Sequence, residues 1–111
     1  MSFLKDSTLL RQSAYINGAW AGADSGRSFP VSNPASGAIL TQVADCGAAE
    51  TGRAIAAAET ALPGWRAKTA AQRGAILRRW NDLILENVED LALLMTLEQG
   101  KPLTESRGEV R

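Results

Sequence analysis

The chain has 111 residues, which is enough for one modest domain and too few for two. Twelve basic residues balance twelve acidic ones without any block of like charges, so neither a nucleic-acid track nor an anionic membrane surface is predicted. A single cysteine and no histidine exclude an internal disulfide, a Cys/His metal cluster and any histidine-dependent catalytic pair.

The first part of the chain, residues 1–45, has the pattern of strands and turns. Tyr15-Ile16 and Ala19-Trp20 flank Asn17-Gly18, a dipeptide that tolerates positive φ at both central positions of a type I′ turn. A tight β-hairpin is therefore predicted here.

A second strand pair is predicted at 29–32 and 39–43. The segment between them, Asn33 to Gly37, contains Pro34 and ends in glycine, as turns do. Because Pro30 has no N–H, its strand is expected at a sheet edge.

From Gly47 onwards the apolar period becomes helical. A helix is predicted over 48–62, with Gly47 as N-cap, Glu50 facing the positive end of the helix, and one apolar face made by Ile55, Ala58 and Leu62. Pro63-Gly64 is expected to end it.

Thr69 and Gln72 form a capping box at the start of a second predicted helix. Its apolar stripe is wide and consists of Ile76, Leu77, Trp80, Leu83 and Ile84. The basic residues of this helix are expected to form a solvated face or a subunit contact; they are Arg73, Arg78 and Arg79.

A third helix is predicted from Asn87, its expected N-cap, to Gly100, which supplies a left-handed exit. Its buried side is predicted to comprise Val88, Leu91, Leu94 and Met95. Pro102 is suited to the first position of a fourth helix, which would run to Arg111 without a C-cap. We therefore expect the sequence to be cut inside a helix.

The three tryptophans lie in separate predicted elements, so they are expected to anchor a core rather than to form a stacking platform for bases. They are Trp20, Trp65 and Trp80. Any buried indole N–H among them should find an acceptor.

Several short motifs, in order and at this spacing, resemble the N-terminus of an aldehyde dehydrogenase. They are Ile16 to Trp20, Asn33 to Gly37, Trp65-Arg66 and Glu98 to Pro102. The resemblance implies an α+β fragment, 1–111, in which β-hairpin strands (1–45) precede three to four helices (46–111). Such a fragment would be part of the α/β, Rossmann-like cofactor-binding domain of that family.

Within the family, residues 61–67 and 95–103 are most similar to NAD(P)-dependent succinate-semialdehyde dehydrogenases. The lack of a long apolar run and of a secretory signal predicts a cytoplasmic protein, and the balanced charge predicts neither a nucleic-acid nor a membrane partner. The resemblance implies a homo-oligomeric enzyme that oxidises succinate semialdehyde to succinate with NAD(P). It also implies that the catalytic and cofactor-binding residues lie downstream, so that the fragment alone is inactive. Two alternatives stay open: another small aldehyde as substrate, and a small non-catalytic helical interaction module or remnant.

Two residues invite functional hypotheses. Cys46 precedes a helix N-terminus that could lower a thiol pKa, but without a pocket or oxyanion donors it is interpreted as structural and dispensable. Glu98 ends an apolar helix, where the helix dipole disfavours a carboxylate. The resemblance implies that Glu98 and a main-chain oxygen near Val31 hold a structural monovalent cation, and the alternative is a solvated carboxylate or one paired with Lys101.

Overall fold

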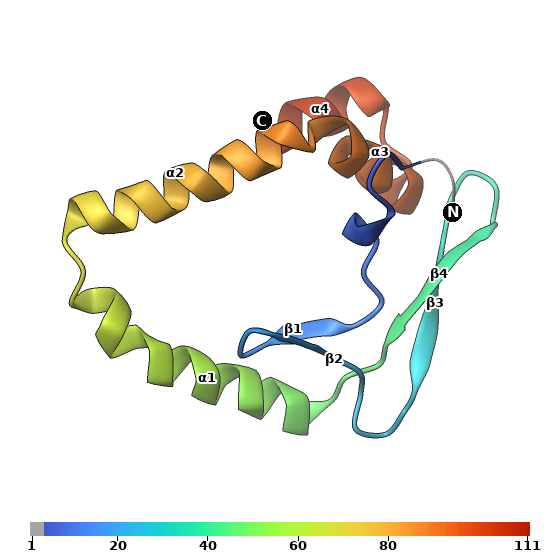
Figure 1. Cartoon of the computed structure of the whole chain (residues 1–111). Helices are drawn as coiled ribbons and strands as arrows, with labels where there is room; N and C mark the ends of the chain where they lie inside the picture. Colours follow the sequence, from blue (N-terminus) through green and yellow to red (C-terminus); the bar gives the residue numbers. More distant parts are fainter. Residues whose placement is uncertain (1–3) are drawn as a thin grey trace.

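The computed structural model describes residues 4–111, which form two antiparallel strand pairs followed by helices (Figure 1). A short 3-10 turn, η1 (Ser7–Leu9), precedes the strands. The strands are β1 (Ala14–Ile16), β2 (Ala19–Ala21), β3 (Ser28–Ser32) and β4 (Ile39–Ala44). The helices are α1 (Ala48–Arg66), α2 (Ala70–Glu86), α3 (Val88–Gln99) and α4 (Leu103–Val110).

Both predicted hairpins are confirmed. In the first, Tyr15 pairs with Trp20, and the turn residues Asn17 and Gly18 have φ of 51° and 79°. This is the left-handed conformation that the Asn-Gly pair tolerates. In the second, β3 pairs with β4 in a two-stranded sheet, so Pro30 lies on an edge strand as expected.

The predicted end of α1 at Pro63 is wrong, because the helix continues through Pro63 to Arg66. Pro63 is in the last turns, where its missing N–H removes a single helical hydrogen bond. The Pro63 carbonyl still accepts from the Ala67 N–H at 3.0 Å, so the backbone pattern resumes after the proline.

The capping box at the start of α2 is confirmed by two hydrogen bonds between Thr69 and Gln72, of 2.9 and 3.2 Å. Asn87 does not cap α3 with its side chain, contrary to expectation. Its Nδ2 donates instead to the Leu83 carbonyl at 2.8 Å, which closes the end of α2. Pro102 stands just before α4, at the cap position rather than the first helical one.

Gly100 ends α3 in the left-handed conformation, with φ of 84°. A Cβ at this position would lie 2.9 Å from Cγ of Pro34, in the turn between β3 and β4. Gly100 is therefore required both by its own backbone and by the close approach of the hairpin to the end of α3.

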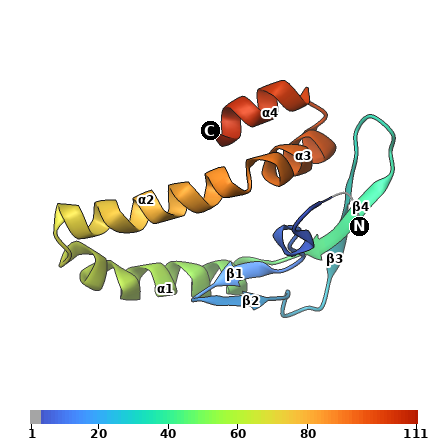
Figure 2. The same cartoon turned by 45° about the horizontal axis from the view of Figure 1, so that its top comes forward.

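The described residues form an open arrangement with little core of their own (Figures 1 and 2). The Cα radius of gyration is 16.7 Å, against about 13 Å for a compact chain of this length. Among residues 4–111 the buried hydrophobic side chains are Leu4 and Ala92. Two of the expected core anchors, Trp20 and Trp80, are 49% and 64% exposed, so that expectation is wrong for them in this chain.

Candidate functional site

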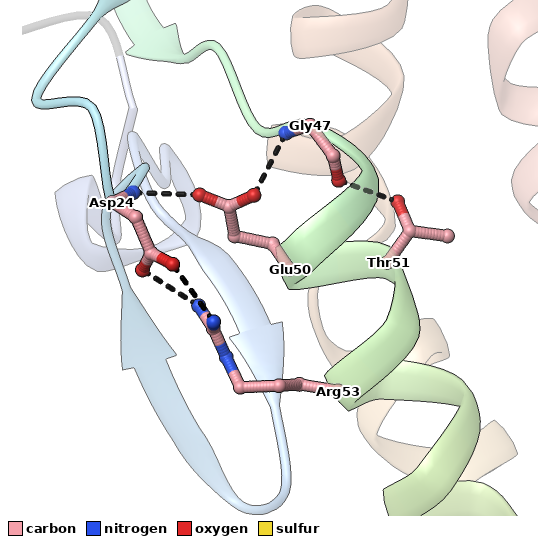
Figure 3. Close-up of polar contacts among 5 residues, drawn as sticks. All are labelled: Asp24, Gly47, Glu50, Thr51 and Arg53. Carbon is pink, nitrogen blue, oxygen red and sulfur yellow. Dashed lines mark hydrogen bonds and ion pairs between the residues drawn. The ribbon is translucent and has the colours of Figure 1, made fainter.

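The carboxylate of Glu50, in the first turn of α1, is held by two backbone N–H groups (Figure 3). Its Oε1 accepts from the backbone N–H of Asp24 at 2.6 Å, and its Oε2 accepts from that of Gly47 at 2.9 Å. The Asp24 N–H, followed by backbone donors at the helix start, lowers the pKa of Glu50 from its ordinary value of 4.5 to about 2. A carboxylate so saturated with donors stays ionised and is a poor proton carrier near neutral pH.

Arg53 adds a second link one turn along α1. Its guanidinium donates twice to the Asp24 carboxylate, at 2.8 and 2.7 Å, and this hydrogen bonding raises the pKa of Arg53 (Figure 3). We refer to Asp24, Gly47, Glu50 and Arg53 as the Glu50 cluster. It joins the segment between β2 and β3 to the start of α1. Its carboxylates and guanidinium form their hydrogen bonds within the cluster.

Asp90, at the start of α3, also joins a helix to a distant segment through its carboxylate. Its carboxylate accepts from the backbone N–H groups of Lys5 and Asp6, at 3.1 and 2.8 Å, and the residue is buried. Asp90 therefore holds the segment before η1 against α3. Sequence reasoning missed this role because the donors are backbone groups about 85 positions away in the chain.

The pairing of α3 with α4 depends on polar contacts. Ser106 is fully buried and its hydroxyl lies 2.8 Å from that of Thr96. At the surface, Arg107 forms a bidentate pair with Glu89, with its closest contact at 2.8 Å. These contacts orient α4 against α3. They join residues 10 and 18 positions apart, so no pattern of neighbouring residues predicts them.

Glu98 and Val31, the residues expected at a cation site, lie in segments that meet. Glu98 is exposed in the last turn of α3, and Val31 is half-buried in β3. The contact between Gly100 and Pro34 brings these two segments together. Lys101 is paired with Glu109, so the alternative pairing with Glu98 is not seen. Within residues 4–111 no three His, Cys, Asp or Glu side chains gather as a metal-binding group, and the cation site stays a prediction.

An open groove of about 450 Å³ separates the β1–β2 hairpin from α1. Its walls are mostly aliphatic and comprise Ile16, Asn17, Ala21, Arg53, Ala56, Ala57 and Thr60. Arg53 is engaged with Asp24, and the Thr60 hydroxyl donates to the Ala56 carbonyl at 2.8 Å. Cys46, a half-buried free thiol, is not among the residues that line this groove. The groove therefore brings together no nucleophile and base.

The family model for the aldehyde dehydrogenase family matches residues 20–111. The chain belongs to the aldehyde dehydrogenase family. A glutarate-semialdehyde dehydrogenase of Pseudomonas aeruginosa is 59% identical over 96% of this chain and 22% of that enzyme. The NADP(+) succinate-semialdehyde dehydrogenase of Escherichia coli is 55% identical over the same shares.

Solved aldehyde dehydrogenase structures contain the same fold. A succinate-semialdehyde dehydrogenase from Burkholderia pseudomallei matches with a TM-score of 0.95 and 56% identity, over 98% of this chain and 23% of that one. The predicted α+β arrangement is thus confirmed as an N-terminal portion of the aldehyde dehydrogenase fold. The chain spans less than a quarter of the length of the relatives it matches.

The strand pairs of this chain do not have the arrangement of a dinucleotide-binding fold. In residues 4–111 both strand pairs are antiparallel, whereas dinucleotide-binding folds place the pyrophosphate at a glycine-rich turn between a parallel strand and a helix. We accordingly derive no step of NAD(P) chemistry from these residues.

None of the helices described is both long and apolar enough to cross a membrane.

Proposed function

We propose that this chain is the N-terminal part of an NAD(P)-dependent semialdehyde dehydrogenase, and that it supplies structure rather than catalytic groups. The observation that carries this proposal is 53–59% identity, over 96% of the chain, to enzymes named for glutarate semialdehyde, 3-sulfolactaldehyde and succinate semialdehyde. The three compounds in these enzyme names have one chemical feature in common: each is an aldehyde with an anionic group elsewhere on a short carbon chain.

The proposed substrate class is therefore a short anionic aldehyde, with succinate semialdehyde and its one-carbon-longer homologue as the candidates. Betaine aldehyde, which is cationic, is less well supported, because the betaine aldehyde dehydrogenases among the solved structures are 33–34% identical to this chain. A stand-alone interaction module is not favoured either, since the match extends along nearly the whole chain.

The test is an activity assay on the native protein, captured from source cells with an antibody against the exposed part of the β3–β4 turn, 34–38. Cofactor reduction with succinate or glutarate semialdehyde, and little with betaine aldehyde, supports the proposal. A preference for betaine aldehyde would overturn the substrate class. Captured protein without any NAD(P)-dependent aldehyde oxidation would overturn the enzymatic role.

A further inference from the structure

The segment before the first hairpin, residues 4–12, runs from α3 to the strand pairs, and we call it the N-terminal strap (Figure 1). At its start, Leu4 is buried, and the backbone N–H groups of Lys5 and Asp6 donate to the Asp90 carboxylate of α3. The strap is therefore attached first to a helix that follows it by more than 80 positions in the chain.

At its other end, the strap is attached to β4 through Gln12. The Gln12 Nε2 donates to the Thr41 hydroxyl at 2.9 Å, and the Gln12 carbonyl accepts from the Ala44 N–H at 2.8 Å. Just before it, the Arg11 guanidinium lies 4.6 Å from the centre of the Trp20 ring in β2. The strap thus contacts α3 and both hairpins.

The strap supplies a second attachment between α3 and the β3–β4 hairpin. The first, between Gly100 and Pro34, joins the C-terminal end of α3 to the turn of the hairpin. The strap joins Asp90, near the other end of α3, to the part of β4 that contains Thr41 and Ala44. Within the described part of the chain, α3 packs mainly on α4 and α2 and has little direct contact with the strands. Two separated attachments fix the angle of the hairpin to the helix, which one attachment cannot do.

The 3-10 turn η1 sets the length of the strap between its two ends. Asp6 is the N-cap of this turn, because its carboxylate accepts from the Thr8 N–H at 2.9 Å and its carbonyl accepts from the Leu9 N–H at 3.2 Å. Opening the turn would lengthen it from about 2.0 Å to about 3.3 Å per residue. Since Asp6 takes part in both the turn and the attachment to Asp90, release at Asp90 allows the turn to open and weakens the attachment to β4.

We propose that the N-terminal strap is a conformational device that holds the β3–β4 hairpin at a fixed angle to α3, and that its two ends open together as one cooperative unit. The inference goes beyond the proposed function, because it concerns contacts within this chain and does not depend on the reaction. Such coupling is reciprocal, so a change at either end must be felt at the other.

The experiment uses the natural gene product that carries this sequence, and it measures amide hydrogen exchange by mass spectrometry. Asp90→Asn weakens the attachment to α3, and Asp82→Asn is the matched control, the same change at an exposed position of α2. We expect Asp90→Asn to speed exchange of the Ala44 amide at least about five-fold, while amides within α1 keep their rates. Asp82→Asn should leave the Ala44 amide unchanged.

The reverse experiment starts at β4. Thr41→Val removes the acceptor of the Gln12 side chain, whereas Thr41→Ser keeps a hydroxyl there. Only the valine variant should speed exchange of the Lys5 and Asp6 amides, again by at least about five-fold, although these amides are bonded to Asp90.

Faster exchange of the Lys5 and Asp6 amides in Asp90→Asn, with an unchanged Ala44 amide, would overturn the proposal, because the two ends would then open independently. Equal acceleration of the amides within α1 would also overturn it, since the variant would then act through the stability of the whole protein. If one of the two variants fails to fold, the other still decides, because the coupling must appear in both directions.

Discussion

At the scale of single residues, the structure depends on a few side chains that join segments distant in sequence. Glu50 illustrates this best, because its position in the first turn of α1 was evident from sequence while its partner Asp24 was not. The helix-capping role requires only a local pattern, whereas the hydrogen bond to the β2–β3 segment requires the three-dimensional fold. The carboxylate consequently connects a helix start to a loop 26 positions away.

Glu50 should make the β2–β3 segment sensitive to acid. Its folded pKa of about 2 lies below its ordinary 4.5, so its stabilising contribution is complete above pH 4.5 and is lost as pH falls toward 2. Glu50→Gln should remove this dependence and speed exchange of the Asp24 amide at neutral pH, as measured by hydrogen exchange. Glu59→Gln, an exposed change on the same helix, is the control. Unchanged exchange in Glu50→Gln would refute the role.

Gly100 should tolerate no side chain. In a full-length chimera, in which this chain replaces the matching segment of the Escherichia coli succinate-semialdehyde dehydrogenase, Gly100→Ala should be destabilising by about 1–2 kcal/mol from the left-handed backbone alone. The contact to Pro34 should add to the loss. Gly108→Ala is the matched control, because it lies in α4 with open space around it and alanine favours a helix, so it should be neutral or stabilising by up to about 1 kcal/mol. Denaturant unfolding of the two variants measures both values. Equal midpoints would contradict the account of the α3 exit.

At the scale of elements, the sequence predicts turns and helix ends that depend on neighbouring residues. It does not predict contacts between segments that are distant in the chain. The Asn17-Gly18 turn, the Thr69–Gln72 capping box and the Gly100 exit follow from backbone preferences of a few neighbouring residues, and all three are confirmed. The stop at Pro63 failed because a proline near a helix end removes only one hydrogen bond. The Asp90 and Ser106 contacts could not be foreseen, since nothing adjacent in sequence reveals their partners.

The α3–α4 pair should depend on the buried hydroxyl contact. Ser106→Ala should cost about 1–2 kcal/mol, because the half-buried Thr96 hydroxyl loses the fully buried Ser106 hydroxyl as its partner. Replacing both residues, as Thr96→Val with Ser106→Ala, should cost less than the sum of the single changes. A double-mutant cycle on the unfolding free energy of the chimera measures the coupling. Strict additivity would show that the two hydroxyls do not interact.

At the scale of the whole molecule, the described residues bury few apolar side chains and expose many. The radius of gyration of 16.7 Å and the exposed apolar side chains of α2, such as Trp80, are what we expect if this segment is, as proposed, part of a larger enzyme. The expectation of a core position failed for Trp20 and Trp80, because residues 4–111 do not provide the surfaces that would cover them. Composition alone gave no sign of this, because 45% hydrophobic content is ordinary for a compact domain.

The isolated chain should therefore behave as a partly ordered protein. We expect it to bind the dye ANS and to unfold gradually on heating, with near-native helix content in far-ultraviolet circular dichroism. Calorimetry and sedimentation together make the measurement. A monomer that unfolds in one sharp transition without binding the dye would show that the segment is a self-sufficient domain.

The most direct test of the central claim, that this chain is a working N-terminal part of an aldehyde dehydrogenase, is the rate of NADP(+) reduction by the chimera with succinate semialdehyde. If the segment supplies structure and the remainder supplies the chemistry, the chimera should retain activity within about ten-fold of the Escherichia coli enzyme, a loss of no more than about 1.4 kcal/mol in the barrier. A soluble, folded chimera without dehydrogenase activity would contradict the claim.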